Sequence, residues 1–185
     1  MYKELDAAVG IAAKLKFKKD AVVFLKKSKE IKAAMLKHLW DKEDKIFYNL
    51  DTNTAGGKNP YGKKIKRITY ASFVPLWCGI PNNADGSAYI KKYLLNPRHL
   101  WAKFGVRTLS AADLDYNQKN IIKPYSNWQG PVWPIANYIA FAGLLNYGFF
   151  NEAKMIAEKM ARLCIDDIKK TGGKPYKQML QNNTS

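Results

Sequence analysis

Aromatic and amide side chains gather around a Gly-Pro pair in the last third of the sequence, where residues 125–138 read YSNWQGPVWPIANY. Trp128 and Trp133 flank the pair, and indole rings stack on the C–H faces of sugars while their N–H groups donate hydrogen bonds. The amides of Asn127 and Gln129 suit hydroxyl groups as hydrogen-bond partners. These residue types fit sugar binding. Taken alone, they fit even better an aromatic-rich helix start that is buried in a core.

Carboxylates are the other groups that could act on a sugar, and two places in the sequence hold them close together. Asp113 and Asp115 lie two positions apart on an irregular stretch before the aromatic segment. Such a spacing is typical of turn formation and loop capping. Asp41, Glu43 and Asp44 form a second acidic cluster, which reads as an exposed turn. Neither cluster predicts a catalytic pair, and no catalytic residue is assigned.

Histidine and cysteine residues are too few and too far apart to suggest a metal site or a cofactor. His38 and His99 stand alone, so neither a metal cluster nor a Ser/His/Asp arrangement is predicted. Cys78 and Cys164 lie in apolar helical surroundings, which favours buried free thiols.

The chain of 185 residues carries 31 Lys and Arg against 15 Asp and Glu, a net charge of +16. This composition excludes collagen, disordered tails and disulfide-stapled mini-proteins. The charge could indicate nucleic-acid binding, but base recognition favours arginine and most of the cations are lysines. A solvated lysine-rich surface is therefore the preferred interpretation. The arginines are Arg67, Arg98, Arg107 and Arg162.

Residues 124–151 contain no charged side chain, and 132–150 are long enough to span a membrane. Pro134 and Asn137 interrupt the run, so a core helix buried inside a larger protein is preferred over a membrane helix. Residues 1–6 lack the apolar core of an export signal, which weakly favours the cytoplasm.

Hydrophobic periodicity predicts paired helices and no alternation of strands with helices, so the expected class is all-α and not a parallel α/β sheet. Between the helices we expect a turn with a short extended segment over 40–51, a loop or hairpin tip over 52–68, and an irregular stretch over 105–130. The predicted helices cover 3–15, 20–39, 70–78, 84–95, 131–147 and 151–170. Residues expected at their ends are Asp20, Thr69, Asn82 or Asn83, Pro131, and Gly172 with Gly173.

The aromatic segment resembles the Tyr-Trp-Arg-Gly-Pro-x-Trp-x-x-x-Asn-Tyr signature of glycoside hydrolase family 63 and the mannosylglycerate-hydrolase-like enzymes. These are (α/α)6-toroid glycosidases, related more distantly to trehalases and glucoamylases. Three further segments are similar to family motifs in the same order, from about residue 2 to 170. They are LWDKEDKIFY (39–48), FVPLWCGI (73–80), and GVRTLS (105–110) with the Asp113 and Tyr116 that follow it.

The resemblance implies roles for the residues of the segment. Trp128 and Trp133 match positions that line the sugar pocket in the family, and the pair Gly130-Pro131 matches the residues that shape it. Asn127 stands where the family has Tyr, which removes a ring face. Gln129 stands where it has Arg, which removes a charge and a rigid fork of donors. The resemblance thus implies sugar binding by these four side chains and puts the family's fine specificity in doubt.

The family's two catalytic carboxyl groups have no match here. Inverting glycosidases use an acid and a base roughly 6.5–9.5 Å apart. The family's acid would precede Met1, and its base follows the last helix in a Gly-Gly-x-x-Glu-x-Tyr stretch. This chain reads GGKPY over 172–176 and has no later acidic residue.

We therefore expect residues 1–185 to form an incomplete domain, about half of an (α/α)6 toroid built of helical hairpins, with the inner faces of helices such as 131–147 exposed. The expected function is that of a fragment of an inverting, metal-independent glycosidase acting on α-linked glucosides, mannosides or oligosaccharides. Its expected partners are such a substrate and the missing half, without nucleic acid or membrane. A non-catalytic sugar- or partner-binding remnant and a basic nucleic-acid-binding helical protein remain alternatives.

Overall fold

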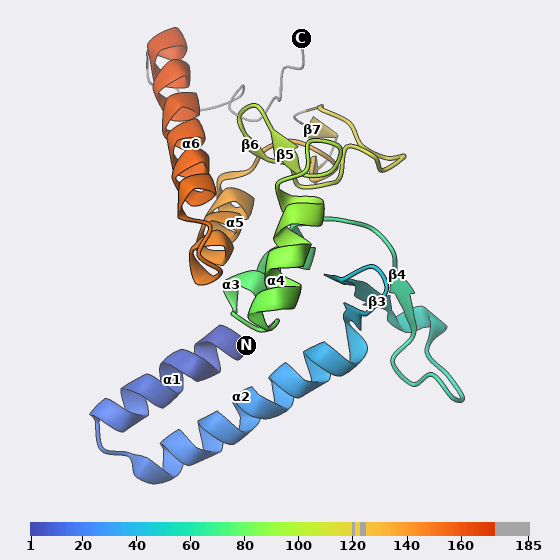
Figure 1. The fold of residues 1–185 in the computed structure, drawn as a ribbon, viewed down its shortest axis with the longest axis vertical. Coiled ribbons are helices and arrows are strands. Elements are labelled where there is room, and N and C mark those ends of the chain that lie inside the picture. Colours follow the sequence, from blue (N-terminus) through green and yellow to red (C-terminus); the bar gives the residue numbers. More distant parts are fainter. Residues whose placement is uncertain (120, 123–124, 173–185) are drawn as a thin grey trace.

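The computed structural model describes residues 1–119, 121–122 and 125–172 of the chain. These residues form six α-helices in the predicted order, so the largely helical architecture is confirmed (Figure 1). The helices are α1 Tyr2–Lys14, α2 Lys18–His38, α3 Val74–Trp77, α4 Asn83–Tyr89, α5 Pro134–Asn146 and α6 Phe150–Thr171.

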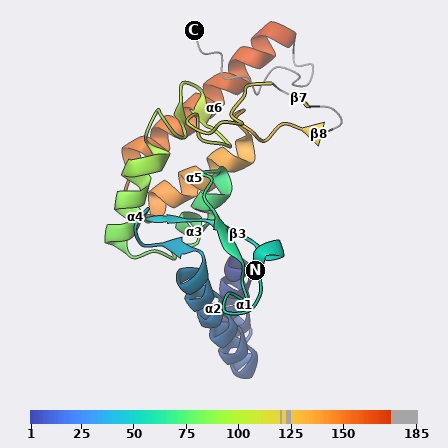
Figure 2. The ribbon, with the colours of Figure 1, turned by 90° about the vertical axis from the view of Figure 1, so that its right-hand side faces the viewer.

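Helices α1 and α2 form a hairpin that projects from the rest of the molecule (Figures 1 and 2). The turn between them is tight, because Lys16 adopts a positive φ of 62° and the Phe17 amide donates to the Ala12 carbonyl at 2.8 Å. The chain therefore re-enters a helix at Lys18, earlier than expected. The prediction that Asp20 caps α2 is wrong, since Asp20 lies inside the first turn.

The two central helices each have an irregular extension. A 3-10 helix, η2 (Tyr70–Phe73), runs directly into α3, and α4 continues as a π-helical turn, η3 (Ile90–Leu94). Asn82 caps α4 as predicted, because its side-chain oxygen accepts from the Asp85 amide at 2.9 Å. Thr69 precedes η2 at the expected place but makes no capping hydrogen bond through its side chain.

Helix α5 starts three residues later than predicted. Pro131 was expected in its first turn, but Val132 pairs with Arg107 in an isolated β-bridge and Trp133 is extended. Pro134 takes the first-turn position instead, where the missing amide of proline costs no hydrogen bond. The later start leaves residues 127–133, which include both tryptophans, outside the helix.

Helix α5 is buried on one side only, in agreement with the expectation that residues 131–147 expose a face in this chain. Ile135, Tyr138 and Leu145 are exposed, and α6 also carries exposed apolar residues. No helix in the part of the chain that the structure describes is long and apolar enough to cross a membrane. Gly172 ends α6 in a left-handed conformation, as predicted, with φ of 65°. Gly173, the other expected stop residue, lies outside the described residues.

Short strands modify the all-α prediction. Within the described ranges they form four separate antiparallel pairs and no continuous sheet, and the expected hairpin at 52–68 is confirmed by the third and fourth strands. The pairs are β1 Trp40–Asp41 with β2 Ile46–Phe47, β3 Asn49–Asp51 with β4 Lys63–Ile65, β5 Trp101–Ala102 with β6 Gly105–Val106, and β7 Ile121–Ile122 with β8 Tyr125–Ser126.

The core lies where α3 to α6 meet the strands β2 and β6. Neither cysteine belongs to its fully buried set: both thiols are free, as expected, but Cys78 and Cys164 are only half-buried. Cys164 lines a groove between α5 and α6, which explains its exposure. The largest fully buried side chains are Tyr89, Phe73, Ile46, Leu76, Ile80, Ile90, Leu94, Leu100, Leu144 and Ile156.

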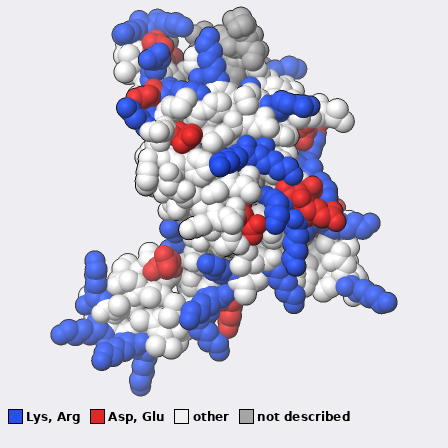
Figure 3. Space-filling view, in the orientation of Figure 1, with Lys and Arg blue, Asp and Glu red and all other residues white. Residues whose placement is uncertain are grey.

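Lysine and arginine side chains are spread over the face drawn in Figure 3, from the α1–α2 hairpin to α6, with acidic side chains among them. They do not form one continuous stripe on this face. On this face, the distribution favours a solvated lysine-rich surface over a continuous nucleic-acid-binding surface.

Candidate functional site

Residues 127–133 of the aromatic segment form an extended loop held by the chain around Thr108. The Thr108 hydroxyl is fully buried, donates to the Pro131 carbonyl at 3.0 Å and accepts from the Gly130 amide at 3.2 Å. The β-bridge at Val132 adds a second attachment. The Gly-Pro turn is therefore fixed by neighbours that are more than 20 residues away in sequence.

Only glycine fits at position 130. Its φ of 150° is a conformation that L-residues rarely adopt. A Cβ atom there would lie 2.1 Å from the Asn117 carbonyl oxygen and 2.8 Å from the ring of Tyr116. The loop over 116–117 thus presses directly on the turn, and the expected shaping role of Gly130 has a steric basis.

Asn127 is buried, with only 2% of its surface exposed. Its amide nitrogen donates to the Asn117 side-chain oxygen at 2.7 Å and to the Lys119 carbonyl, while its oxygen accepts from the Gln129 amide at 2.8 Å. Its hydrogen bonds are thus made inside the loop. Asn127 holds the loop together and does not present its amide to a ligand, which differs from the expected sugar contact.

Trp128 and Trp133 stack face to face, with ring centroids 4.5 Å apart and planes only 4° from parallel. The Trp133 indole N–H donates to the Asn127 carbonyl at 2.9 Å, so this ring is fixed. Trp128 remains 37% exposed, and its indole N–H has no partner among the described residues. The pair is therefore one unit in which Trp133 supports Trp128.

Tyr70 is a member of this aromatic group that the sequence did not reveal. Its ring lies 5.2 Å from that of Trp128, tilted by 38°. Two backbone contacts bring it there, a bridge between Thr69 and Leu109 and a hydrogen bond of 3.0 Å from the Tyr70 amide to the Thr108 carbonyl. No local sequence pattern predicts these contacts, because they join segments nearly 40 residues apart.

Gln129 keeps part of its hydrogen-bonding capacity. Its side-chain oxygen accepts from the Asn117 amide group at 3.2 Å, and its backbone carbonyl accepts from the Asn117 backbone at 2.8 Å. The side-chain nitrogen has no partner within the described residues. Gln129 can thus donate to a ligand beside Trp128.

Asn137 fixes the start of α5 to strand β6, a role that the sequence did not reveal. The side chain is 1% exposed, accepts from the Val106 amide at 2.7 Å, and donates to the carbonyls of Val106 and Trp133. Gly105 leaves space for it, since a Cβ there would lie 2.5 Å from the Asn137 oxygen. The orientation of Trp133 thus depends on a buried amide one helical turn away.

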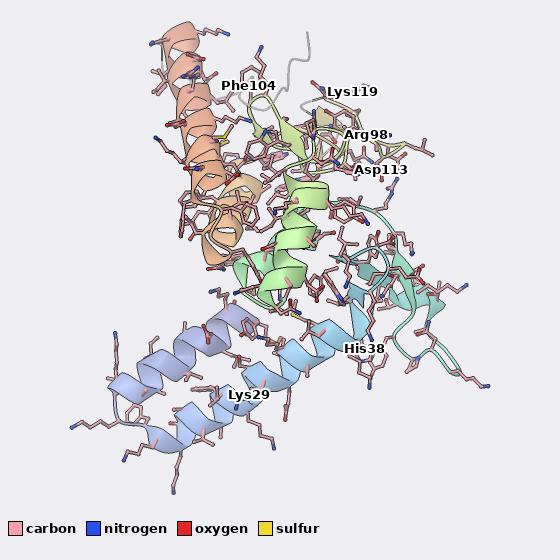
Figure 4. All side chains as sticks on the ribbon, in the orientation of Figure 1. Lys29, His38, Arg98, Phe104, Asp113 and Lys119 are labelled. Atoms are coloured by element: carbon pink, nitrogen blue, oxygen red, sulfur yellow. The ribbon has the colours of Figure 1, made fainter. Side chains whose placement is uncertain are left out.

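Asp113, labelled in Figure 4, and Asp115 lie on one loop, and one cation binds both. The same guanidinium nitrogen of Arg67 contacts Asp113 at 2.9 Å and also contacts Asp115. The two carboxylates raise the pKa of Arg67, first through the hydrogen bond to Asp115. Because both carboxylates pair with one guanidinium, they do not fit an acid and a base on opposite sides of a glycosidic bond. The predicted turn role is supported by the hydrogen bond of 3.0 Å from the Asp115 amide to Asp113.

The acidic cluster at 41–44 forms the predicted turn. Asp41 accepts from the amides of Glu43 and Asp44 at 3.1 and 3.0 Å, which closes the hairpin of β1 and β2. Lys64 and Lys66 pair with this cluster. Its function is local structure.

The histidines lie apart and make local contacts. His38 lies against the ring of Tyr61, with centroids 3.8 Å apart, and His99 is hydrogen-bonded to Ser110 at 2.9 Å. Across the described ranges, no three His, Cys, Asp or Glu side chains are grouped so that they could hold a metal ion.

Comparison with known proteins places this geometry in context. Residues 1–173 match the family model described as the mannosylglycerate hydrolase MGH1-like glycoside hydrolase domain. A cytosolic neutral trehalase of Neurospora crassa is 28% identical over 135 residues, which cover 72% of this chain and 16% of that protein. The mannosylglycerate hydrolase of Rubrobacter radiotolerans is 26% identical over 129 residues, 70% of this chain and 27% of that protein.

Solved structures share the fold. A family 63 mannosylglycerate hydrolase from Thermus thermophilus, in complex with glucose, aligns with a TM-score of 0.68 at 20% identity, over 91% of this chain and 35% of that one. Neutral trehalase from Saccharomyces cerevisiae aligns with a TM-score of 0.65 at 16% identity, over 84% of this chain and 26% of that one. The chain thus spans between about a sixth and about a third of the length of these relatives.

Proposed function

Because the chain belongs to the mannosylglycerate hydrolase MGH1-like glycoside hydrolase family, we propose that it forms the sugar-binding wall of a glycosidase domain. The substrates in this proposal are α-linked glucosides, mannosides or oligosaccharides. The names of the relatives, trehalases and mannosylglycerate hydrolases, support this substrate class.

The observation that carries the proposal is the stacked indole pair. Trp133 is held by Asn127, Trp128 lies on Trp133, and Tyr70 lies beside Trp128. A partly exposed indole that is held rigid offers a flat apolar face at low entropic cost, which suits the C–H face of a pyranose. The Trp128 indole N–H and the Gln129 side-chain nitrogen have no partner among the described residues, so both are available to donate to ring hydroxyls.

We further propose that the chain is about half of an (α/α)6 toroid and that the rest of the domain supplies the acid and the base. Support comes from the share of the family 63 structure that the chain covers, 35%. It also comes from the pairing of Asp113 and Asp115 with Arg67, which leaves them unsuited to catalysis. In the complete domain, the acid protonates the leaving oxygen while the base activates water on the opposite face, with inversion.

Calorimetric titration with a neutral α-linked oligosaccharide tests the sugar site. We expect saturable binding to this chain that Trp128→Ala weakens by at least about tenfold, because the exposed stacking face and its N–H are lost. Leu114→Ala is the control, since Leu114 is fully exposed and outside the aromatic group. Equal affinity of Trp128→Ala and the parent chain would refute the assignment of the pocket.

A non-catalytic sugar-binding role differs from this proposal in one measurable property. Joined to the remainder of its domain, the chain should support hydrolysis if the glycosidase proposal is right. Binding without hydrolysis in that complete domain would favour the non-catalytic alternative. Binding of DNA or RNA that weakens steeply with salt would instead favour the nucleic-acid alternative.

A further inference from the structure

A separate groove of about 310 Å³ lies between the turn that joins β5 to β6 and one face of α6. Figure 4 labels Phe104 in this turn, on the side that faces α6. The contributing residues of α6 follow the helical repeat, so they form one stripe along it. The lining residues are Lys103, Phe104, Met155, Glu158, Lys159 and Arg162.

Two cations stand close together behind the groove. The Lys159 ammonium donates to the Ala102 carbonyl at 2.7 Å and lies 4.0 Å from the centre of the Trp101 ring. Arg107, which is 8% exposed, donates to the adjacent carbonyl of Trp101 at 2.7 Å. Burial and the charge of Arg107 both lower the pKa of Lys159. The positive charges of Lys159 and Arg107 repel each other, so an anion bound nearby would be stabilised by both.

The structure offers little negative charge in return. Glu158 is the one carboxylate of the lining, and its oxygen lies 3.7 Å from Lys154, outside the groove. Within the described residues, Lys103, Lys159 and Arg162 form no ion pair. Three cations and one carboxylate thus line the groove. A groove with a net positive charge attracts anions.

The groove also has an apolar wall. The Phe104 ring and the Met155 thioether contribute it, and the Lys103 ammonium lies 5.3 Å from the centre of the Phe104 ring. Its volume is at the lower end for small-molecule sites, which begin at about 300 Å³. The lining therefore suits a ligand that combines a compact, multiply charged anion with a small carbon skeleton.

We propose that this groove binds a small phosphate monoester, with Arg162 and Lys103 contacting the phosphate and Phe104 packing on the carbon skeleton. A phosphate monoester carries nearly two negative charges at neutral pH and three acceptor oxygens, which matches a cluster of cations better than one carboxylate does. Arginine also binds phosphate through a planar fork of donors. The site shares no residue with the proposed sugar site.

Calorimetry on the whole chain at constant ionic strength tests this site, with glucose 6-phosphate, inorganic phosphate and glucose as probes. We expect glucose 6-phosphate to bind more tightly than either of the other two. Arg162→Gln should weaken it about tenfold, the loss typical of one charge-assisted hydrogen bond. Phe104→Ala should remove the advantage of glucose 6-phosphate over inorganic phosphate.

Lys29→Gln is the matched control, because it removes the same charge from an exposed position on α2, far from the groove (Figure 4). Equal weakening by Lys29→Gln and Arg162→Gln would overturn the proposal, since the anion would then respond only to the net charge. Absence of saturable binding would also overturn it. Leu114→Ala lies in neither proposed site and should leave this affinity unchanged. The titration with a neutral oligosaccharide reads the sugar site separately, so a failure here is distinguishable from a failure of the sugar site.

Discussion

Polar side chains that could bind a ligand can instead make all their hydrogen bonds inside the loop that carries the candidate site. Asn127 was expected to meet a sugar hydroxyl, yet its amide is bonded to Asn117, Lys119 and Gln129. The indole N–H of Trp133 is likewise used by a carbonyl. Among the described residues, Trp128 and Gln129 keep donors without a partner, while internal hydrogen bonds hold the rest of the loop in place.

Thr108 gives the clearest test of this view. Thr108→Val removes a hydroxyl that satisfies the buried Gly130 amide and the Pro131 carbonyl, which should lower the free energy of unfolding by about 1–3 kcal/mol. Sugar affinity should fall as well, because the turn that supports Trp128 loosens. Urea denaturation and calorimetric titration measure the two effects.

Thr108→Ser is the control, since it keeps the hydroxyl and should retain most of the affinity. If Thr108→Val bound sugar as tightly as the parent chain, the turn would not position the aromatic group.

At the scale of elements, the sequence predicts the helices well but the segments that connect them poorly. Helical spacing and the cap at Asn82 place the six helices within a few residues. The start of α5 was misplaced because Val132 pairs with Arg107, a contact across 25 positions that periodicity does not reveal. The same holds for Tyr70, which long-range backbone pairing brings to Trp128. Trp128 and Trp133 could be identified as candidate site residues because they belong to one local sequence motif. Tyr70 could not, because only long-range contacts bring its ring to Trp128.

The β1–β2 hairpin should make stability depend on acid. Hydrogen bonds from the Asp44 amide and from Lys64 lower the pKa of Asp41, and Lys66 lowers that of Asp44, in each case below the usual 3.8. Their contribution is therefore complete above about pH 5, and it is lost as pH falls through the lowered folded-state values.

Denaturation at pH 6 and pH 3 should show a smaller loss of stability for Asp41→Asn than for the parent chain, by on the order of 1 kcal/mol. Glu30→Gln removes an exposed carboxylate from the middle of α2, away from this hairpin, and serves as the control. If Asp41→Asn lost as much free energy of unfolding between pH 6 and pH 3 as the parent chain does, groups other than Asp41 would cause the acid response.

At the scale of the whole molecule, the proposed half-toroid leaves an apolar surface open. The groove between α5 and α6 has a volume of about 330 Å³ and is lined almost wholly by apolar side chains, among them Tyr138, Phe141, Met160 and Ala161. Exposed Ile135, Ile165 and Ile168 extend the apolar surface along both helices. Contiguous patches of this kind mark interaction surfaces or a liability to aggregate.

The isolated chain should therefore self-associate as its concentration rises in about 0.15 M salt, where its net charge is largely screened. Ala161→Glu places a charge in the groove and should shift association to at least about tenfold higher concentration. Sedimentation velocity measures the shift.

Ala13→Glu adds the same charge at an exposed position on α1 and serves as the control. Should both variants associate as the parent chain does, the groove would not be the contact surface.

The projecting α1–α2 hairpin has a consequence for how this chain melts. Its two helices pack mainly on each other; Tyr2 and Met35 pack against the core, and Lys32 and Leu36 line a pocket with residues 80–82. Opening the hairpin therefore exposes little of the core, and the lysines crowded on α2 repel one another throughout. We therefore expect the hairpin and the core to unfold as separate cooperative units, so that calorimetry should show heat absorption spread over two transitions.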